Sequence, residues 1–267
     1  MPADVKLAVE HVTKYYVINR DTGERVHALD DCSFTVADGE IVALIGSSGC
    51  GKTTLLKIIH GLIPADTGSI RVGGQEVRGP GHDRGMVFQH VGLLPWRTVL
   101  ENVEFGLEIK RVPKKERRAI AERFIAIVGL QGFEHRHPHQ LSGGMRQRVG
   151  LARALAIDPA VLLMDEPFGA LDAQTKELLQ AELLRIQAAT GKTIVFVTHD
   201  LDEAVYLADR VVVMSPRPGR IREIVPIEIP RPRPDVATVK QTPEFLTKRT
   251  HIWQSLSAVR VDEETAA

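Results

Sequence analysis

Hydrophobic positions along the 267-residue chain fall in short runs whose spacing changes between that of strands and that of helices. Residues 5–12 alternate with the period of a half-buried strand, and residues 41–45 are apolar at every position, as in a strand buried on both faces. From Lys52 the apolar side chains have helical spacing, and Gly61 supplies a stop signal. The pattern therefore predicts a strand, a glycine-rich loop and a helix in succession. Further strands are predicted over residues 28–36, 69–72, 86–88, 161–164, 193–197, 211–214 and 221–229.

The middle of the chain has a different pattern. Residues 99–157 are rich in helical periodicity, which is interrupted by Pro113 and by a turn-rich stretch over residues 129–140. A helix predicted over residues 175–189 separates two buried strands, and this βαβ order is typical of a parallel sheet. The sequence therefore predicts an α/β fold with a helical lobe at about residues 98–157.

Two regions are expected along the chain. Residues 5–229 would hold the sheet and the helical lobe as one domain. Residues 230–267 would follow as a C-terminal region, with a proline- and arginine-rich connector over residues 230–235 and a helix over residues 243–259.

Composition excludes several classes of protein. With 43% hydrophobic and 25% charged residues, the chain is neither collagen-like nor disordered. Lys+Arg and Asp+Glu both number 34, so no global positive charge attracts nucleic acid or an anionic membrane. The longest apolar runs are far shorter than the ~20 residues of a membrane helix, and no secretory signal is seen. Only Cys32 and Cys50 are cysteines, which favours a reduced, cytoplasmic compartment.

The first chemical motif lies between the strand ending at residue 45 and the helix starting at Lys52. It fits the phosphate-loop pattern G-x-x-x-x-G-K-[ST], and the strand before it and the helix after it are the context that supports this interpretation. Glycines let successive N–H groups point at phosphate oxygens, Lys52 would reach the β- and γ-phosphates, and the Thr53 hydroxyl would bind Mg²⁺. The residues of the motif are Gly46, Ser47, Ser48, Gly49, Cys50, Gly51, Lys52 and Thr53.

Two carboxylates end the buried strand over residues 161–164. By themselves, Asp165 and Glu166 are compatible with a solvated acidic turn. Beside a phosphate loop, however, a carboxylate at the end of a neighbouring strand is needed to hold the metal, and Asp165 is placed for it. Glu166 would then orient and deprotonate the attacking water.

A second candidate anion site lies at the start of a helix near residue 142. Ser142 is placed as an N-cap, and Gly143 and Gly144 occupy the first turn. The alternative is an ordinary capped helix. Each glycine costs ~0.8–1.0 kcal/mol of helix stability relative to alanine, and this cost indicates the close approach of a ligand.

Together these motifs resemble the ATP-binding subunit of an ABC transporter over residues 5–229. Residues 46–53 are similar to the Walker A motif, 161–166 to Walker B, and 141–148 to the LSGGQ signature, with Met145 where glutamine is commoner. The resemblance implies a phosphate-loop core with a parallel sheet, an N-terminal antiparallel β subdomain and an inserted α-helical lobe.

The resemblance extends to weaker elements that occur in the family's order. Gln89 is similar to the Q-loop glutamine, residues 169–172 to the D-loop, and His199 to the switch histidine. Tyr16 is similar to the aromatic residue that stacks on adenine, with Tyr15 as a competitor. The implied cofactors are ATP and Mg²⁺. The implied catalytic residues are Glu166, His199 and Gln89, and the implied metal ligands are Thr53, Gln89 and Asp165. The implied nucleotide-binding residues are those of the loop and Tyr16, together with Thr54, Ser142, Gly143 and Gly144.

The resemblance also implies partners. ATP would lie between the Walker A loop of one protomer and the signature helix of the other, so a homodimer would hold two composite sites. Transmembrane permease subunits would be separate proteins, and a periplasmic or extracellular solute-binding protein would act indirectly. The subunit would then lie on the cytoplasmic face of the inner membrane, with no nucleic-acid partner.

Three further segments are similar to the subgroup that imports nitrate, aliphatic sulfonates, taurine or related small solutes. They are residues 93–96, 98–103 and 215–221. Because residues 93–96 follow Gln89, we expect them to form a docking groove for the permease. The alternative is that Trp96 packs into the helical lobe.

Other classes of protein account for less of the sequence. An ABC ATPase of lipid trafficking or cell division is an alternative, because it would carry the same motifs. A soluble ABC ATPase acting on nucleic acid usually has a long coiled-coil insertion or two nucleotide domains, and neither is seen in this sequence. A phosphoryl transferase with the same loop would leave residues 141–148 unexplained.

Overall fold

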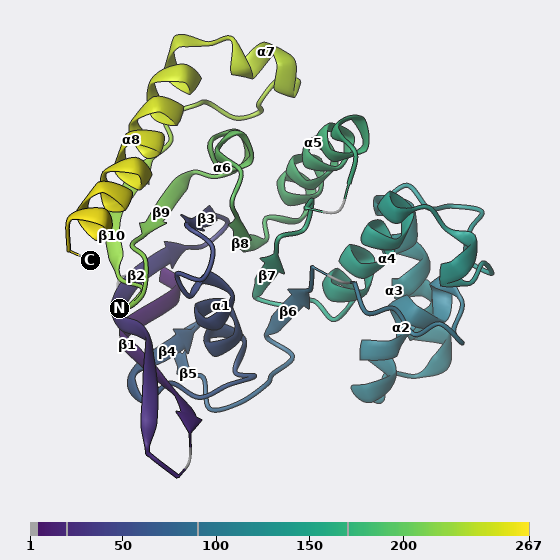
Figure 1. Cartoon of the computed structure of the whole chain (residues 1–267). Coiled ribbons are helices and arrows are strands. Elements are labelled where there is room, and N and C mark those ends of the chain that lie inside the picture. The colour runs from purple at the N-terminus through teal and green to yellow at the C-terminus, as the bar shows by residue number, and fades with distance from the viewer. Residues whose placement is uncertain (1–4, 20, 90, 170, 267) are drawn as a thin grey trace. The chain divides into compact units, whose positions relative to one another are not determined.

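The computed structural model describes residues 5–19, 21–89, 91–169 and 171–266, with side chains through Ser257. The described residues form two compact units. The first contains the chain up to Gly81 and from Thr193 onward, and the second is His82–Lys192. Their helices and strands are labelled in Figure 1.

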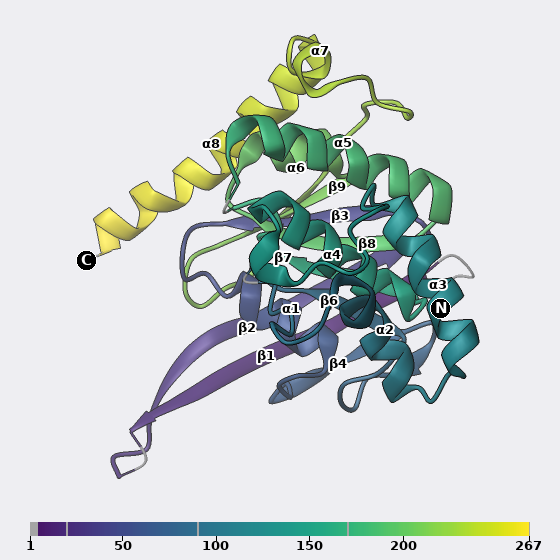
Figure 2. The same cartoon turned by 90° about the vertical axis from the view of Figure 1, so that its right-hand side faces the viewer.

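An antiparallel sheet forms part of the first unit. Its strand β1 pairs with β2 on one side and with β4 on the other, and Val9 lies opposite both Phe34 and Ile70. All three side chains are buried, so apolar residues meet across neighbouring strands. Figure 2 shows β1 and β2 as a long twisted hairpin. The strand order is β2-β1-β4-β5, with β1 Val5–Asn19, β2 Glu24–Ala37, β4 Thr67–Val72 and β5 Gln75–Glu76.

Strand β1 continues well beyond the predicted end at residue 12. Past Val12 the main chain still pairs with β2, as far as Asn19 opposite Glu24. The side chains of Tyr15, Tyr16 and of the residues that follow are exposed, so the alternation of burial ends before the hydrogen bonding does. A prediction based on hydrophobic period therefore stopped too early.

A mostly parallel sheet forms the other part of the first unit. Strand β3 is buried at every position and runs parallel to β8 and β9, while β10 adds to β9 antiparallel. The bounds are β3 Ile41–Gly46, β8 Thr193–Thr198, β9 Arg210–Met214 and β10 Ile221–Pro226. After β3 the chain turns into α1 Lys52–His60, which Gly61 ends in the left-handed conformation. The turn between β3 and α1 thus lies at the carboxyl end of a parallel strand, where open α/β sheets bind ligands.

The second unit combines two parallel strands with helices. Strand β6 Arg84–Val87 pairs with β7 Val161–Asp165. Helix α2 starts with a capping box between Thr98 and Glu101 and packs on α3 and α4. Gly106 allows close packing, because a Cβ there would lie 2.4 Å from Ile157 Cγ2. The helices are α2 Val99–Ile109, α3 Lys114–Ile127, η1 Pro138–Gln140, α4 Gly143–Ala156 and α5 Ala173–Thr190.

The connector after β10 is held to the turn that follows α6 Leu201–Leu207. Arg231 Nε donates to Asp209 Oδ1 at 2.9 Å, and Arg233 Nη2 donates to the Ala208 carbonyl at 2.8 Å. Burial, together with the nearby charge of Arg231, lowers the pKa of Arg233 to about 10, so its guanidinium stays charged at neutral pH. The stretch predicted to be a connector is therefore fixed by two arginines.

The chain ends in α7 Val236–Lys240 and α8 Pro243–Ala266, and α8 is longer than the predicted helix. Helix α8 packs on α6 and β9, with Phe245 and Ile252 buried. Glu223 of β10 accepts hydrogen bonds from His251 and from Ser255 Oγ, the latter at 2.9 Å. Burial opposes ionisation of Glu223, but these bonds and the charge of His251 outweigh it and lower the pKa of the carboxyl. Helix α8 is thus anchored along its middle turns.

These observations bear on the predicted organisation. The α/β prediction is confirmed, with antiparallel and parallel strands in the first unit and packed helices after residue 98. The division into residues 5–229 and 230–267, with a lobe at 98–157, stays a prediction. In the part of the chain that the structure describes, no helix is both long and apolar enough to cross a bilayer.

Candidate functional site

The loop between β3 and α1 is built on close approaches that only glycine permits. A Cβ at Gly46 would lie 2.6 Å from Cys50 Sγ and 2.9 Å from the Met214 carbonyl. Gly51 has a φ of 98°, and a Cβ there would lie 2.6 Å from a methyl group of Leu29. The glycines of the motif therefore serve a tight loop packed against its own unit.

Lys52, the first residue of α1, places its charge inside this loop. Its side chain is buried, and Nζ donates to the carbonyls of Gly46 at 2.8 Å and Ser47 at 2.9 Å. The ammonium thus lies next to the start of a helix whose first N–H groups also attract anions. Thr53 and Thr54 follow in the first turn of the same helix and are half-buried.

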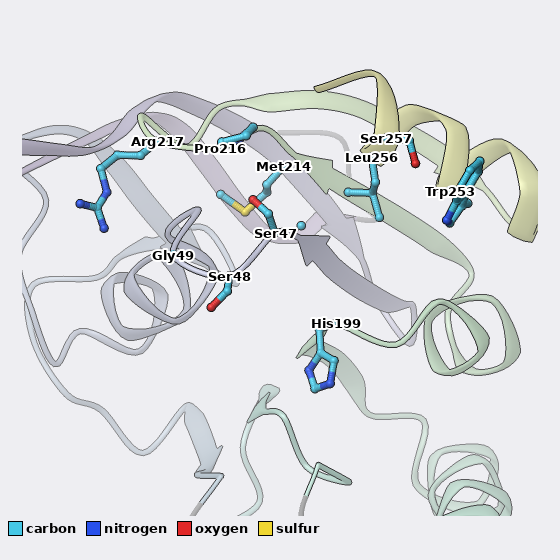
Figure 3. A pocket seen from close by; sticks show the side chains of 11 residues that line it. Ser47, Ser48, Gly49, His199, Met214, Pro216, Arg217, Trp253, Leu256 and Ser257 are labelled. Carbon is cyan, nitrogen blue, oxygen red and sulfur yellow. The ribbon is translucent and has the colours of Figure 1, made fainter. Parts of the chain in front are cut away.

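A cavity of about 700 Å³ opens beside this loop within the first unit. Figure 3 shows the loop on one side and α8 on the other. The structure places His199, which follows β8, in the lining of this cavity, together with the loop. The complete lining is Gly46, Ser47, Ser48, Gly49, His199, Met214, Pro216, Arg217, Trp253, Leu256 and Ser257.

Two parts of this lining were missed by reasoning from the sequence. The sequence identifies residues 215–221 only as a segment similar to the importer subgroup, yet Arg217 brings a guanidinium Nη2 to 3.8 Å from the position of a Cβ at Gly49. The same turn supports the loop, since a Cβ at Gly219 would lie 2.0 Å from the Cys50 carbonyl oxygen. In the sequence, Gly219 and Arg217 were the residues that could have indicated a role for this turn. For Trp253 and the rest of α8 the sequence offered none.

The two candidate residues for stacking on adenine lie side by side on β1. Tyr15 stacks on His27, with ring centroids 4.3 Å apart. The Tyr16 ring has Lys14 Nζ 5.8 Å from its centroid and is about as exposed as Tyr15. Neither tyrosine lines the cavity. Because His27 already covers one face of the Tyr15 ring, Tyr16 is the better candidate for stacking on adenine. This role of Tyr16 stays a prediction.

In the second unit, three predicted site residues lie at the ends of β6 and β7. Asp165 ends β7 as a buried carboxylate, and Glu166 follows it. Gln89 Nε2 donates to Glu166 Oε2 at 3.1 Å. Glu166 has a φ of 45°, a left-handed conformation that costs a non-glycine residue ~1–3 kcal/mol. Such strain is typical of residues whose position serves a function.

The predicted signature helix begins as expected, but its two glycines differ. Ser142 caps α4 by accepting a hydrogen bond from the Met145 N–H at 3.3 Å. Gly144 is buried, and a Cβ there would lie 2.7 Å from Thr175 Cγ2 on α5. Its lack of a side chain is therefore explained by helix packing as well as by any ligand. Ser142 and Gly143 are exposed.

The predicted D-loop over residues 169–172 is only partly seen. Ala170 lies outside the described residues. Asp172 caps α5 by accepting from the Thr175 N–H at 3.0 Å, and the hydrogen bonds from Thr175 lower the pKa of the Asp172 carboxyl.

Known proteins resemble this chain over the region that contains most of these motifs. A sequence model of the family described as "ABC transporter" matches residues 29–169. An ABC transporter ATP-binding protein of Methanocaldococcus jannaschii is 58% identical over 86% of this chain and 85% of its own length. The taurine import ATP-binding protein TauB of Escherichia coli O6:K15:H31 is 47% identical over 84% of this chain and 89% of its own.

Solved structures of ATP-binding cassettes have a similar fold. A dimeric post-hydrolysis ATP-binding cassette bound to ADP and Pi is 33% identical, with a TM-score of 0.73, and covers 84% of this chain and 99% of that one. A component of a Clostridium perfringens ABC transporter complex is 27% identical, with a TM-score of 0.74, and covers 92% and 94%. The predicted family and fold class are therefore confirmed.

Lys52→Ala is expected to weaken ATP binding at least about tenfold, because it removes the buried cation that belongs to the loop. Isothermal titration calorimetry measures the affinity, and circular dichroism reports whether the fold survives. Lys57→Ala, on the same helix but outside the loop, is the matched control. ATP affinity equal to the parent's would contradict the phosphate-loop assignment.

Proposed function

The chain belongs to the ABC transporter ATP-binding family, and we propose that it powers the import of nitrate, sulfonates, taurine or a related small solute. Its ATPase activity follows from the family. The observation that carries the proposal is the loop around Lys52, which shares one cavity with His199. The solute class is supported by the 47% identity to a taurine import protein.

The chemistry at the nucleotide needs a cation, a metal and a base. Lys52 and the loop N–H groups would bind the phosphates, and His199, which lines the same cavity as the loop, would contact the γ-phosphate. Glu166 would accept the proton of the attacking water, and the hydrogen bond from Gln89 holds the Glu166 carboxylate in position.

Mg²⁺ suits the oxygen donors that the motifs supply. The Thr53 hydroxyl, the Asp165 carboxylate and the amide oxygen of Gln89 are hard ligands, which Mg²⁺ prefers. The hydrogen bond from Gln89 Nε2 to Glu166 leaves that amide oxygen to the metal. Mg²⁺ is usually held by one or two protein side chains together with phosphates, so a dense protein cage is not required. When bound, the ion neutralises charge on the phosphates.

Two copies of the chain form the working unit. Ser142 and Gly143 are exposed at the start of α4, where N–H groups can meet the phosphates bound by another protomer. ATP therefore joins two protomers, and its cleavage removes the contacts that keep them closed. The relatives of known structure include a dimeric cassette bound to ADP and Pi, which supports this arrangement.

A separate membrane permease binds the surface around Trp96, on the cytoplasmic side of the membrane. Trp96 is 71% exposed, so the alternative of a core tryptophan is wrong. The buried side chain of Asn102 holds the turn behind it, accepting from the Leu94 N–H at 2.8 Å and donating to the Arg97 carbonyl at 3.0 Å. An indole displayed on a rigid turn suits an apolar anchor for a permease helix, and the external solute-binding protein selects the solute.

Glu166→Gln is expected to lower ATP turnover by ~10²–10⁴, the range for loss of a general base. The amide can still accept the hydrogen bond from Gln89, so the local geometry is retained. Size-exclusion chromatography with Mg-ATP should then show a dimer that no longer reopens. Glu177→Gln, an exposed residue on α5, is the control, and turnover equal to the parent's would show that another group activates the water.

Mixing two variants tests whether the site is shared. Ser142→Arg should abolish hydrolysis, because its bulk blocks the partner's ATP. In a heterodimer of Lys52→Ala and Ser142→Arg protomers, sharing leaves one site with both lesions and one with neither. Nucleotide trapping should therefore find one intact site per heterodimer, and finding none would reject the shared arrangement.

Trp96→Ala should weaken assembly with the permease by ~2 kcal/mol or more, as expected for an interface hot spot. The melting temperature and the basal ATPase of the isolated subunit should stay nearly unchanged, because the side chain is exposed. Co-purification with the membrane subunit measures assembly. Ile109→Ala, at a residue 58% exposed, is the control. A large fall in melting temperature with intact assembly would contradict the docking role.

A further inference from the structure

Helix α8 gives the cavity beside the phosphate loop an apolar wall. The loop contributes the hydroxyls of Ser47 and Ser48, whereas α8 contributes the side chains of Trp253 and Leu256 together with the smaller, polar Ser257. Figure 3 shows these two groups on different sides of the cavity, with the side chain of Leu256 projecting from α8 toward the space between them. The loop side of the cavity is thus suited to an anion, whereas Trp253 and Leu256 make the α8 side mainly apolar.

The exposure of Trp253 does not come from a loosely attached helix. Its neighbour Ile252 is fully buried, and His251 and Ser255 both hydrogen-bond to Glu223. Arg249 also pairs with Asp202 on α6, with 2.7 Å between Nε and Oδ1. The helix is therefore fixed on both sides of the tryptophan, which is nevertheless 55% exposed.

Phosphate does not account for this wall. Phosphates are bound by N–H groups, hydroxyls and cations, and the loop, Lys52 and Arg217 supply those in the same unit. A leucine and the face of an indole offer phosphate no comparable interaction. They match an apolar protein surface, and tryptophan is enriched among the residues that dominate the energy of interfaces.

We propose that Trp253 and Leu256 contact a second copy of this chain when ATP closes the dimer. The proposal rests on the proposed function, in which the partner protomer approaches ATP bound at this loop. Because the loop and the α8 wall line one cavity, whatever covers the ATP on this side also meets α8. The C-terminal helix therefore belongs to the ATP-dependent interface.

This contact has a consequence for the dimer. A two-fold interface repeats every contact, so the loss of one side chain removes two contacts. Closure therefore depends on the anchoring of α8 as well as on ATP.

The first experiment measures the dissociation constant of the dimer in Mg-ATP by analytical ultracentrifugation, in the Glu166→Gln background that cannot hydrolyse. Adding Trp253→Ala should weaken the dimer by about 30-fold or more. The matched control is Leu246→Ala, because Leu246 is 51% exposed on the same helix but outside the cavity; it should change the constant by less than about threefold. The affinity of each variant for Mg-ADP shows whether the loop itself is intact.

The outcomes are distinct. An unchanged dimer in Trp253→Ala, or equal weakening in Leu246→Ala, would overturn the proposal while leaving the proposed function in place. A loss of Mg-ADP affinity that accounts for the weaker dimer would assign Trp253 to the nucleotide pocket instead, and would also overturn it. If Glu166→Gln forms no dimer with Mg-ATP at all, the proposed closure is wrong and this contact is wrong with it.

A second experiment uses Trp253 as its own reporter. The chain has two tryptophans, so Trp96→Phe leaves Trp253 alone. In the Glu166→Gln background, Mg-ATP should shift the Trp253 emission to shorter wavelength as the indole is buried, and Mg-ADP should not. Adding Ser142→Arg, which blocks closure, should abolish the shift. A shift of equal size in that variant would show that Trp253 senses nucleotide in its own protomer, and the proposal would fail.

Discussion

The close packing around the phosphate loop is the constraint on which the first unit depends. Strand β3 lies between β8 and β9 and is buried at every position. The loop therefore begins at the carboxyl end of this strand, at the edge of the sheet. There Gly46 lies against Cys50 and Met214, while Gly219 lies against the Cys50 carbonyl from the β9–β10 turn. Any side chain at these two glycines would push the loop away from its support. The loop's shape is therefore set by its neighbours as much as by its own sequence.

This packing also decides where charge lies. Lys52 is buried yet satisfied, because the curved loop turns the carbonyls of Gly46 and Ser47 toward its ammonium. The same curvature leaves Ser48 and Gly49 exposed at the cavity, where His199 and Arg217 also lie. The fold thus gathers a buried ammonium, a histidine and an arginine around one loop.

The second unit uses local constraint in a different way. Glu166 is held in a left-handed conformation at the end of β7, and Gln89 meets it from the end of β6. Because the two strands are parallel and adjacent, their carboxyl ends bring a glutamine and a glutamate together that are 77 positions apart in the chain. Asn102 similarly fixes the turn that displays Trp96. In both places a buried or strained residue orients an exposed one.

The sequence by itself determined the features that depend on local pattern. The strand at residues 41–45, the helix from Lys52 to Gly61, the cap at Ser142 and the motif glycines follow from period and residue type, because their causes lie within a few residues. Tertiary structure decided what depends on distant partners. The exposure of Trp96 depends on Asn102, the need for glycine at position 144 depends on Thr175, and strand β1 extends to Asn19 because β2 pairs with it. Arg217 and Trp253 joined the site only because β9, β10 and α8 bring them to the loop, and no local pattern encodes contacts between residues so far apart in the chain.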